Sequence, residues 1–161
     1  MRFFEKISFE QFKKDICDDI EFYNNYELPR RGSKNSCGYD FFSINDIVLR
    51  PGEIVKIPTG YKASFMEDEA LLLVVRSSMV FKANIRMCNQ VGVIDSDYYG
   101  NTSNEGHMWV ALKNEGDNDY IIKKGDAYCQ GIFVKYLTVD DDRADGVRTG
   151  GIGSTNKESE W

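Results

Sequence analysis

The sequence has few of the residues that build metal centres or disulfide frameworks. Its 161 residues include one histidine, His107, which is too few for a histidine-based metal site. Its four cysteines, Cys17, Cys37, Cys88 and Cys129, form no C-x-x-C pair, and their spacing matches neither a zinc site nor a disulfide framework. We therefore expect buried or half-buried free thiols, as is usual in a reducing cytosol.

Long apolar runs and an excess of basic residues are also missing. No apolar stretch approaches membrane-spanning length, and the N-terminal MRFFEKISFEQFKKDI lacks the apolar core of a signal peptide. The formal net charge is -6, whereas a general nucleic-acid binder needs a basic face. These features predict a cytoplasmic protein without membrane or nucleic-acid partners. A small anionic ligand stays compatible, because a few arginines and a metal ion can reverse the local field.

What the sequence does contain is a series of short apolar segments separated by turns. With 42% apolar residues, the chain is able to bury the core of one domain. From Gly38 onward, the segments YDFFS, ALLLVVRSS, HMWVALKN and QGIFVKYL are typical of strands, and the run ALLLVV is typical of a strand buried on both faces. Many short strands at this spacing predict an all-β sandwich or barrel.

The two ends of the chain differ from this pattern. An S-x-x-Q capping box at Ser8 precedes apolar residues at helical spacing and predicts one short helix, and the acidic CDDIEFYNNYELPRRGSKNS after it reads as a loop. The last residues are polar and Gly-rich, which is typical of a flexible arm. We therefore divide the chain into a β domain over 1–147, of which 1–35 is an N-terminal extension, and an arm over 148–161.

Four segments carry side chains suited to phosphate chemistry, although each is ambiguous alone. Asp40 in SCGYDFFS has the position of a turn aspartate. Arg76, followed by two serines, offers a bidentate cation beside hydroxyls, but an arginine at a strand end is as often a surface residue. Gln130 follows the predicted hairpin turn KKGD and is either a satisfied core group or a ligand contact. RTGGIGSTN is either a phosphate-binding loop or a loose tail.

A fifth segment, NQVGVIDSDYYGN at 89–101, places a carboxylate at the end of an apolar strand. Asp95 in that position could orient and deprotonate a water molecule. Strand alternation would put Asp95 and Asp97 on one face, and two carboxylates on one face usually indicate a solvated surface. The segment alone therefore leaves both interpretations open.

In this order and at this spacing, the five segments resemble the motifs of the trimeric dUTPase family, over roughly residues 36–156. The resemblance implies a distorted β jelly roll, or β-clip, with a short N-terminal helix and a flexible C-terminal arm. It implies a homotrimer with active sites between subunits, where the arm closes over a site that other subunits build. It also implies dUTP diphosphatase activity: hydrolysis of dUTP to dUMP and pyrophosphate, with Mg²⁺ held by the phosphates and by water.

The resemblance further assigns roles to individual residues. Asp95 would activate the water that attacks the α-phosphorus, and Tyr98 would pack under the sugar and exclude a 2'-hydroxyl. The wall that reads the uracil would consist of Asn89, Val91, Gly92 and Ile94. The phosphates would be held by Arg76, Ser77, Ser78 and Gln130, and the closed arm would contribute Arg148, Ile152, Gly153, Ser154 and Thr155. Asp40 and Gln130 would reach the Mg²⁺ through water.

The sequence departs from the family pattern in three places. Ser78 replaces the glycine of the usual R-S-G, and Ile152 replaces an aromatic residue that stacks on uracil, so we expect weaker arm closure. Residues 101–106, NTSNEG, are a small loop insertion, and no role follows for the N-terminal helix.

Two other functions compete with this one. A dCTP deaminase, alone or bifunctional with dUTPase activity, often has R-S-S, but its glutamate in G-H-x-x-x-E-L corresponds to Ala111 in GHMWVAL. Deamination would then lack a proton carrier. A non-catalytic regulatory or structural jelly-roll protein would have degraded motifs, whereas Asp95, Tyr98 and GGIGST are intact.

Overall fold

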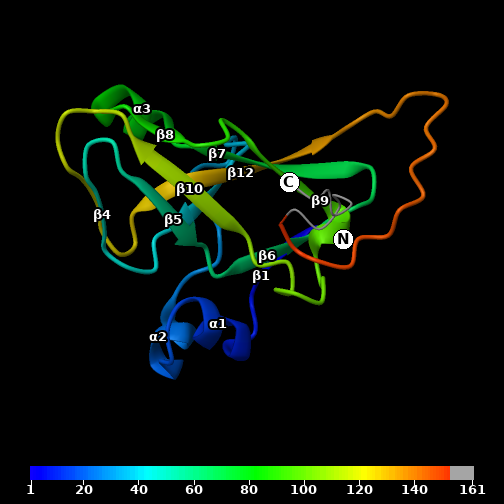
Figure 1. The fold of residues 1–161 in the computed structure, drawn as a ribbon, viewed down its shortest axis with the longest axis horizontal. Coiled ribbons are helices and arrows are strands. Elements are labelled where there is room, and N and C mark those ends of the chain that lie inside the picture. Colours follow the sequence, from blue (N-terminus) through cyan, green and yellow to red (C-terminus); the bar gives the residue numbers. More distant parts are fainter. Residues whose placement is uncertain (153–161) are drawn as a thin grey trace, which may run out of the picture.

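The computed structural model describes residues 1–152, and antiparallel strands dominate it (Figure 1). The strands are β1 (Phe3–Lys6), β2 (Arg30–Arg31), β3 (Tyr39–Phe42), β4 (Ile47–Leu49), β5 (Ile54–Pro58), β6 (Tyr61–Ser64), β7 (Glu69–Val75), β8 (Ile85–Met87), β9 (Gly92–Asp95), β10 (Trp109–Asn114), β11 (Tyr120–Ile122) and β12 (Ala127–Lys135). The helices are α1 (Phe9–Asp15), α2 (Ile20–Asn25), α3 (Ser77–Ala83) and the 3-10 turn η1 (Ser96–Tyr98). The prediction of an all-β fold is confirmed.

The strands form several open sheets. The largest has the order β2-β3-β12-β7-β9, a second has the order β5-β10-β8, and two ribbons pair β1 with β6 and β4 with β11. Strands that are distant in the sequence therefore lie side by side, as β12 lies between β3 and β7. This arrangement brings segments from residues 39–42, 69–75, 92–95 and 127–135 into one sheet.

The core lies around the two long central strands, β7 and β12. Leu71 and Leu73 of β7 and Cys129 of β12 are fully buried or nearly so, and Phe41 of β3 packs in the same cluster. No residue of β7 is exposed, because the positions that alternate with the buried ones are still half-covered. The continuous apolar run thus forms a central strand that is covered on both faces, as its composition predicted.

The predicted N-terminal helix is confirmed as α1. The Ser8 hydroxyl accepts a hydrogen bond from the Gln11 N–H and so caps the first turn. The prediction that the next segment is a loop is wrong, since α2 and β2 form within it. Asp19 caps α2 by accepting from the Phe22 N–H, and α2 is held mainly by aromatic packing on Phe12 of α1.

Two further local predictions need correction. KKGD does form a turn, with the Asp126 N–H donating to the Lys123 carbonyl, but it is not a hairpin turn. The strands that it joins belong to different sheets, because β11 pairs with β4 whereas β12 pairs with β3 and β7. The R-S-S-M segment begins α3, which the sequence did not predict, and β1 was not predicted either.

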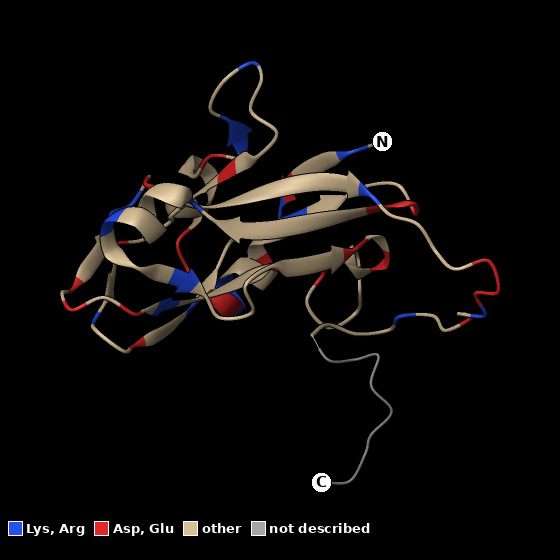
Figure 2. Ribbon diagram, turned by 90° about the horizontal axis from the view of Figure 1, so that it is seen from above, with Lys and Arg blue, Asp and Glu red and all other residues tan. Residues whose placement is uncertain are grey.

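After β12 the chain projects away from the sheets and then returns past β9 (Figure 1). The projecting segment exposes apolar residues, including Leu137, which is 97% exposed. Figure 2 shows acidic residues gathered on this segment, whereas lysines and arginines are dispersed over several elements. Within residues 1–152, none of the helices combines the length and apolar character that crossing a bilayer requires.

The four cysteines are free thiols. Cys129 is buried and Cys17 is half-buried, as predicted, but Cys37 and Cys88 are exposed. Burial raises the pKa of the Cys129 thiol to about 12, so this group stays protonated near neutral pH. Cys88 is exposed because it lies in the turn between β8 and β9 rather than in a strand.

Candidate functional site

One group of predicted site residues gathers where β3, β12 and β7 run side by side. Gln130 of β12 lies opposite Asp40 of β3 and opposite Val74 of β7. The Arg76 Nε atom, just beyond the end of β7, lies 3.4 Å from Asp40 Oδ1. Ser77 and Ser78 follow as the first residues of α3 and are exposed. The fold therefore brings together the cation, hydroxyl, carboxylate and amide groups that the resemblance assigns to the phosphate end.

Gly38 makes this cluster possible. It is buried, and a Cβ atom there would lie 2.3 Å from Oε1 of Gln130. Any other residue would push the glutamine side chain out of its place, because contacts below 3.0 Å require something to move. The glycine before the strand thus leaves space for the Gln130 side chain in its observed position, and no positive φ calls for a glycine there.

A second group lies at the far edge of the same sheet, where β9 ends. Asp95 is the last residue of β9, and η1 follows immediately. Arg148 from the C-terminal segment donates from Nη2 to Asp95 Oδ2 at 2.7 Å and from Nε to Asp97 Oδ1 at 2.8 Å. One guanidinium therefore holds both carboxylates, while their side chains remain 56% and 54% exposed.

This geometry corrects the expectation that strand alternation places the two carboxylates on one face. The strand stops at Asp95, and the turn η1 brings Asp97 back toward the same guanidinium. Both carboxylates are partly solvated, as expected, but Asp97 is more than a surface carboxylate because it forms half of the contact with Arg148.

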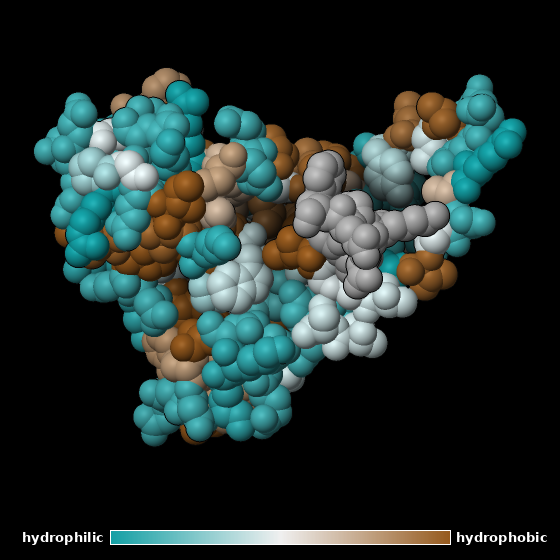
Figure 3. Space-filling model, in the orientation of Figure 1, coloured by the Kyte–Doolittle hydropathy of each residue, from teal (hydrophilic) through white to brown (hydrophobic). Residues whose placement is uncertain are grey.

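Beside Asp95 lies a cavity of about 480 Å³ that contains much of the predicted base-reading wall. Asn89, Gly92 and Ile94 line the cavity, and so does Ile152 from the arm. Val91, which precedes Gly92 in the chain, was predicted to belong to the wall but does not line the cavity. Figure 3 shows a hollow lined with hydrophobic residues on this face of the molecule, between the regions of β10 and β9. A mostly apolar cavity with a few polar groups at its edge suits a planar base.

The sequence did not identify several residues that line the cavity. They are Lys56, Leu73, Met87, Cys88, Val93, Trp109, Val110 and Ala111. Except for Cys88, which lies in the turn after β8, they come from strands of two sheets. The Cys88 N–H donates to the Ala111 carbonyl of β10. Only the strand pairing places β10 against the motif that contains Asn89, and no local pattern in the sequence signals that pairing.

Tyr98 is buried at the start of the loop insertion. Its hydroxyl donates to the His107 carbonyl at 2.9 Å and accepts from Asn104 Nδ2 at 2.8 Å. The Arg148 guanidinium lies over the Tyr98 ring, 5.8 Å from its centroid. Burial raises the pKa of Tyr98, so the hydroxyl keeps its proton and remains a donor.

The two groups lie at opposite ends of β7. Asp95 is paired with Ala70, near the start of the strand, whereas Arg76 follows its last residue. At about 3.3 Å per residue, the backbone positions of Asp95 and Arg76 are about 20 Å apart. The carboxylate group and the group around Arg76 are therefore separated by the whole length of β7.

The described part of the arm lies over its own chain. Besides the contact of Arg148 with the two carboxylates, Ile152 lines the base cavity. The predicted arm residues Gly153, Ser154 and Thr155 lie outside the described residues.

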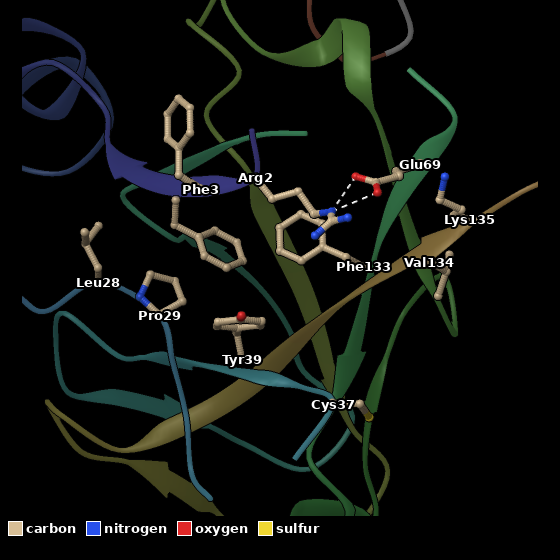
Figure 4. A pocket seen from close by; sticks show the side chains of 11 residues that line it. Arg2, Phe3, Leu28, Pro29, Cys37, Tyr39, Glu69, Phe133, Val134 and Lys135 are labelled. Carbon is tan, nitrogen blue, oxygen red and sulfur yellow. Dashed lines mark hydrogen bonds and ion pairs between the residues drawn. The ribbon is translucent and has the colours of Figure 1, made fainter. Parts of the chain in front are cut away.

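A separate cavity of about 640 Å³ contains none of the predicted ligand-binding residues. Its lining comes from β1, the 28–37 segment and the end of β12, and Figure 4 shows the rings of Phe133 and Tyr39 beneath it. Arg2 and Glu69 point toward one another at one side, with Nε 2.7 Å from Oε2. This cavity has a mixed lining, in which the Arg2–Glu69 ion pair and Lys135 accompany the aromatic rings.

The described residues contain no group of three or more His, Cys, Asp or Glu side chains placed to hold a metal ion. The oxygen donors nearest the phosphate cluster are those of Asp40 and Gln130, which face each other across neighbouring strands. Oxygen ligands of this kind suit Mg²⁺, which usually keeps several waters and binds to substrate phosphates.

Comparisons with known proteins agree with this geometry. A family model described as dUTPase matches residues 24–156. The deoxyuridine 5'-triphosphate nucleotidohydrolase of Lactococcus lactis is 42% identical over 130 residues, which cover 80% of this chain and 87% of that protein. The protein of the same name from Finegoldia magna is 34% identical over 119 residues, which cover 73% and 79% of the two chains.

Solved structures give the same result. The crystal structure of dUTPase from Streptococcus mutans matches with a TM-score of 0.69 and 36% identity, over 85% of this chain and 98% of that one. A dUTPase of phage phi11 of S. aureus, in a structure that describes a coordinated structural Mg(II) ion, shares the fold with a TM-score of 0.67 and 22% identity, over 91% and 97%. With its family model, its relatives and its fold in agreement, this chain belongs to the dUTPase family.

Proposed function

We propose that this protein hydrolyses dUTP to dUMP and pyrophosphate. The observation that carries the proposal is the arrangement at the end of β9, where Asp95 lies beside an apolar cavity lined by Asn89 and Gly92 and close in sequence to the buried Tyr98. A base in that cavity would place its sugar toward Tyr98 and its first phosphate toward the carboxylate. An exposed carboxylate at that point is able to take a proton from an attacking water.

The residues that line the cavity also fit the binding of uracil better than the deamination of cytosine. None of the described residues that line it carries a carboxylate, and Ala111 lies where a deaminase would need its glutamate. The cavity is narrow around Gly92, where a Cβ atom would lie 3.2 Å from the Leu73 side chain. Polar groups near Asn89 would read the base edge, and a wrong base would leave them unpaired.

The phosphate chain would be held by Arg76, the two serines after it and Gln130, and by Arg148 once the arm has closed. Mg²⁺, when bound, would supply charge neutralisation of the phosphates, with Asp40 and Gln130 able to hold its waters. In the present structure Arg148 contacts Asp95 and Asp97. In catalysis this guanidinium would have to leave Asp95, so that the carboxylate oxygen is free to accept a hydrogen bond from the attacking water.

We further propose that the active protein is a homotrimer with shared sites. The support is the separation of about 20 Å along β7 between the carboxylate group and the phosphate-binding group. A complete site then needs the Asp95 end of one chain and the Arg76 end of another. The arm over 148–161 would close over such a site, either from the same chain or from a neighbouring one. A cytoplasmic location of the protein stays a prediction.

Pyrophosphate release from each deoxynucleoside triphosphate and from UTP, with Mg²⁺ present and absent, tests the proposal. We expect release from dUTP alone and dependence on Mg²⁺. Conversion of dCTP to a uracil nucleotide would establish the deaminase instead. Binding of dUTP without release of pyrophosphate would support a non-catalytic regulatory protein.

A further inference from the structure

The loop at 101–106 and the N-terminal extension have no role in the function proposed above. In the structure they contact each other, and the loop also contacts both Tyr98 and the start of the arm. These contacts connect the two ends of the chain at the sugar-binding side of the candidate site.

The loop meets the arm through a hydrogen bond and a close backbone approach. The Thr102 hydroxyl donates to the Thr149 carbonyl at 2.6 Å. Gly151 is buried, and a Cβ atom there would lie 2.8 Å from Ser103 Oγ and 3.4 Å from Asn104 Nδ2. A larger residue at this position would displace the Ser103 side chain or move the segment away from the loop.

The loop is held in one conformation by a buried amide. Asn101 Oδ1 accepts hydrogen bonds from the Ser103 N–H, the Ser103 hydroxyl and the Asn104 N–H. Its Nδ2 donates to the Tyr98 carbonyl at 2.8 Å. A loop with this many internal bonds has little conformational entropy left to lose when another segment docks on it.

Asn104 connects the arm contact to the residue expected under the sugar. Its Nδ2 atom donates to the Tyr98 hydroxyl at 2.8 Å and to the His107 carbonyl at 3.2 Å, and it is the same atom that Gly151 approaches. A shift of the arm against the loop would therefore move the bond that holds Tyr98.

The N-terminal extension holds this loop through side-chain contacts at Glu105 and at His107, which we call the brace. The Glu105 carboxylate accepts from the Ser8 N–H at 3.0 Å and from the Ser8 hydroxyl, and it also pairs with Lys62. At the end of the loop, the buried His107 bonds through Nδ1 to Asp15 of α1 at 2.6 Å. The cap and the last residue of α1 thus both hold the loop.

We infer that the 101–106 loop is the platform on which residues 149–151 dock, and that it couples the position of this segment to that of Tyr98. The brace from α1 keeps the platform in place. The inference rests on the proposed function for the identity of the substrate, whereas the docking itself is a property of the chain.

Amide hydrogen exchange of residues 149–152, in nucleotide-free protein and with the dUTP analogue dUpNHpp, tests the docking. Thr102→Val removes the hydroxyl at almost the same volume, and we expect roughly 3- to 10-fold faster exchange, as for one lost hydrogen bond. Thr102→Ser keeps the hydroxyl and should exchange like wild type, as should Thr138→Val, a matched change on an exposed threonine. Gly151→Ala places a methyl group against the Ser103 hydroxyl and should likewise increase amide exchange at residues 149–152. Unchanged exchange in both Thr102→Val and Gly151→Ala would overturn the inference.

The brace is tested by Asp15→Ala, with Asp18→Ala as the control on an exposed aspartate nearby. We expect faster exchange at 101–107, followed by faster exchange at 149–152, and a smaller preference for dUTP over UTP. A loosened loop with an unchanged arm would show that the brace does not support docking.

The exchange measurement in nucleotide-free protein separates this inference from the proposed function. If the wild type releases no pyrophosphate from dUTP, the proposed function fails, and exchange at 149–152 still decides whether the loop holds the arm.

Discussion

At the scale of single residues, the structure shows how the surroundings of two neighbouring aspartates differ. Asp95 and Asp97 have almost the same exposure and share one guanidinium. They differ in their neighbours, since Asp95 ends the strand whose preceding residues line the base cavity, and Asp97 lies in the turn beyond it. On the proposed function, position relative to the cavity therefore distinguishes the candidate base, Asp95, from Asp97.

Asp95→Asn should lower kcat for dUTP about 10²- to 10⁴-fold, because general-base catalysis contributes about that much. Nucleotide binding, followed by calorimetry with dUpNHpp, should persist. Asp97→Asn is the matched control, since it breaks the other half of the same surface ion pair, worth about 0.2–1 kcal/mol. Its kcat should fall at most about fivefold. Equal losses in the two variants would show that the ion pair matters and that Asp95 is not the base.

His107 makes stability depend on pH. Burial lowers its pKa, an effect that the neighbouring Asp15 carboxylate opposes. Its Nε2 accepts from the Gly60 N–H at 2.9 Å, so the folded state holds the neutral ring. Because the folded pKa lies below the unfolded value of about 6.5, this stabilisation is present above that pH and is lost as the pH falls toward the folded pKa.

We therefore expect the melting temperature of the wild type to fall between about pH 7 and about pH 5. His107 is the only histidine in the sequence, so His107→Gln should flatten this dependence. Parallel curves for the two proteins would contradict the assignment. Thermal unfolding by circular dichroism over this range makes the measurement.

At the scale of elements, sequence patterns predicted those parts whose signal is local. The Ser8 cap and the helical spacing after it predicted α1, and the continuous apolar run predicted the central strand β7. The pattern failed for α2, which has six residues and no buried residue of its own. Such a short helix is marginal alone and forms here because its aromatic residues pack on Phe12, a contact that no local rule reveals.

The same limit explains what could be predicted of the site. The motif order predicted Asp40, Arg76, Asp95 and Gln130 as site residues, because each lies in a recognisable segment. The contribution of β10 to the base cavity, the contact of Arg148 with Asp97 and the network around Asn104 all depend on pairings between distant segments. Burial and partner choice of this kind are properties of the folded sheet and not of a window of sequence.

The packing of α1 and α2 should be a measurable part of the stability. Phe12 is fully buried among aromatic rings, and Phe12→Ala should lower the free energy of unfolding by about 3–5 kcal/mol. Phe81→Ala makes the same chemical change at a side chain that is 89% exposed and should stay within about 0.5 kcal/mol of wild type. Urea titration gives both values. Similar losses in the two variants would mean that Phe12 is not a core residue.

At the scale of the whole molecule, the separation of the two groups along β7 makes a prediction about mixtures. Arg76→Ala and Asp95→Asn should each be nearly inactive. If sites are shared between chains, a site in a mixed assembly is intact when one chain supplies an unmodified Asp95 and another an unmodified Arg76. Co-refolding equal amounts should then restore about a quarter of the wild-type activity, since each half is intact in about half of the sites.

The mixing experiment needs two controls. Each variant refolded with itself should remain inactive, and wild type refolded with itself should keep its activity. If every site lay within one chain, every chain of the mixture would carry one defect, and the mixture would remain as inactive as its components.

The length of β7 has a further consequence. Removing two residues from this strand would preserve the alternation of its side chains, so the chain would still bury the same face. It would also shorten the distance between the Asp95 and Arg76 ends by about 7 Å. Even in a subunit that still folded, a site assembled between neighbouring subunits would then lose its fit to a nucleotide. On the proposed arrangement, the number of residues in β7 is therefore constrained by the size of the nucleotide and not only by the folding of the subunit.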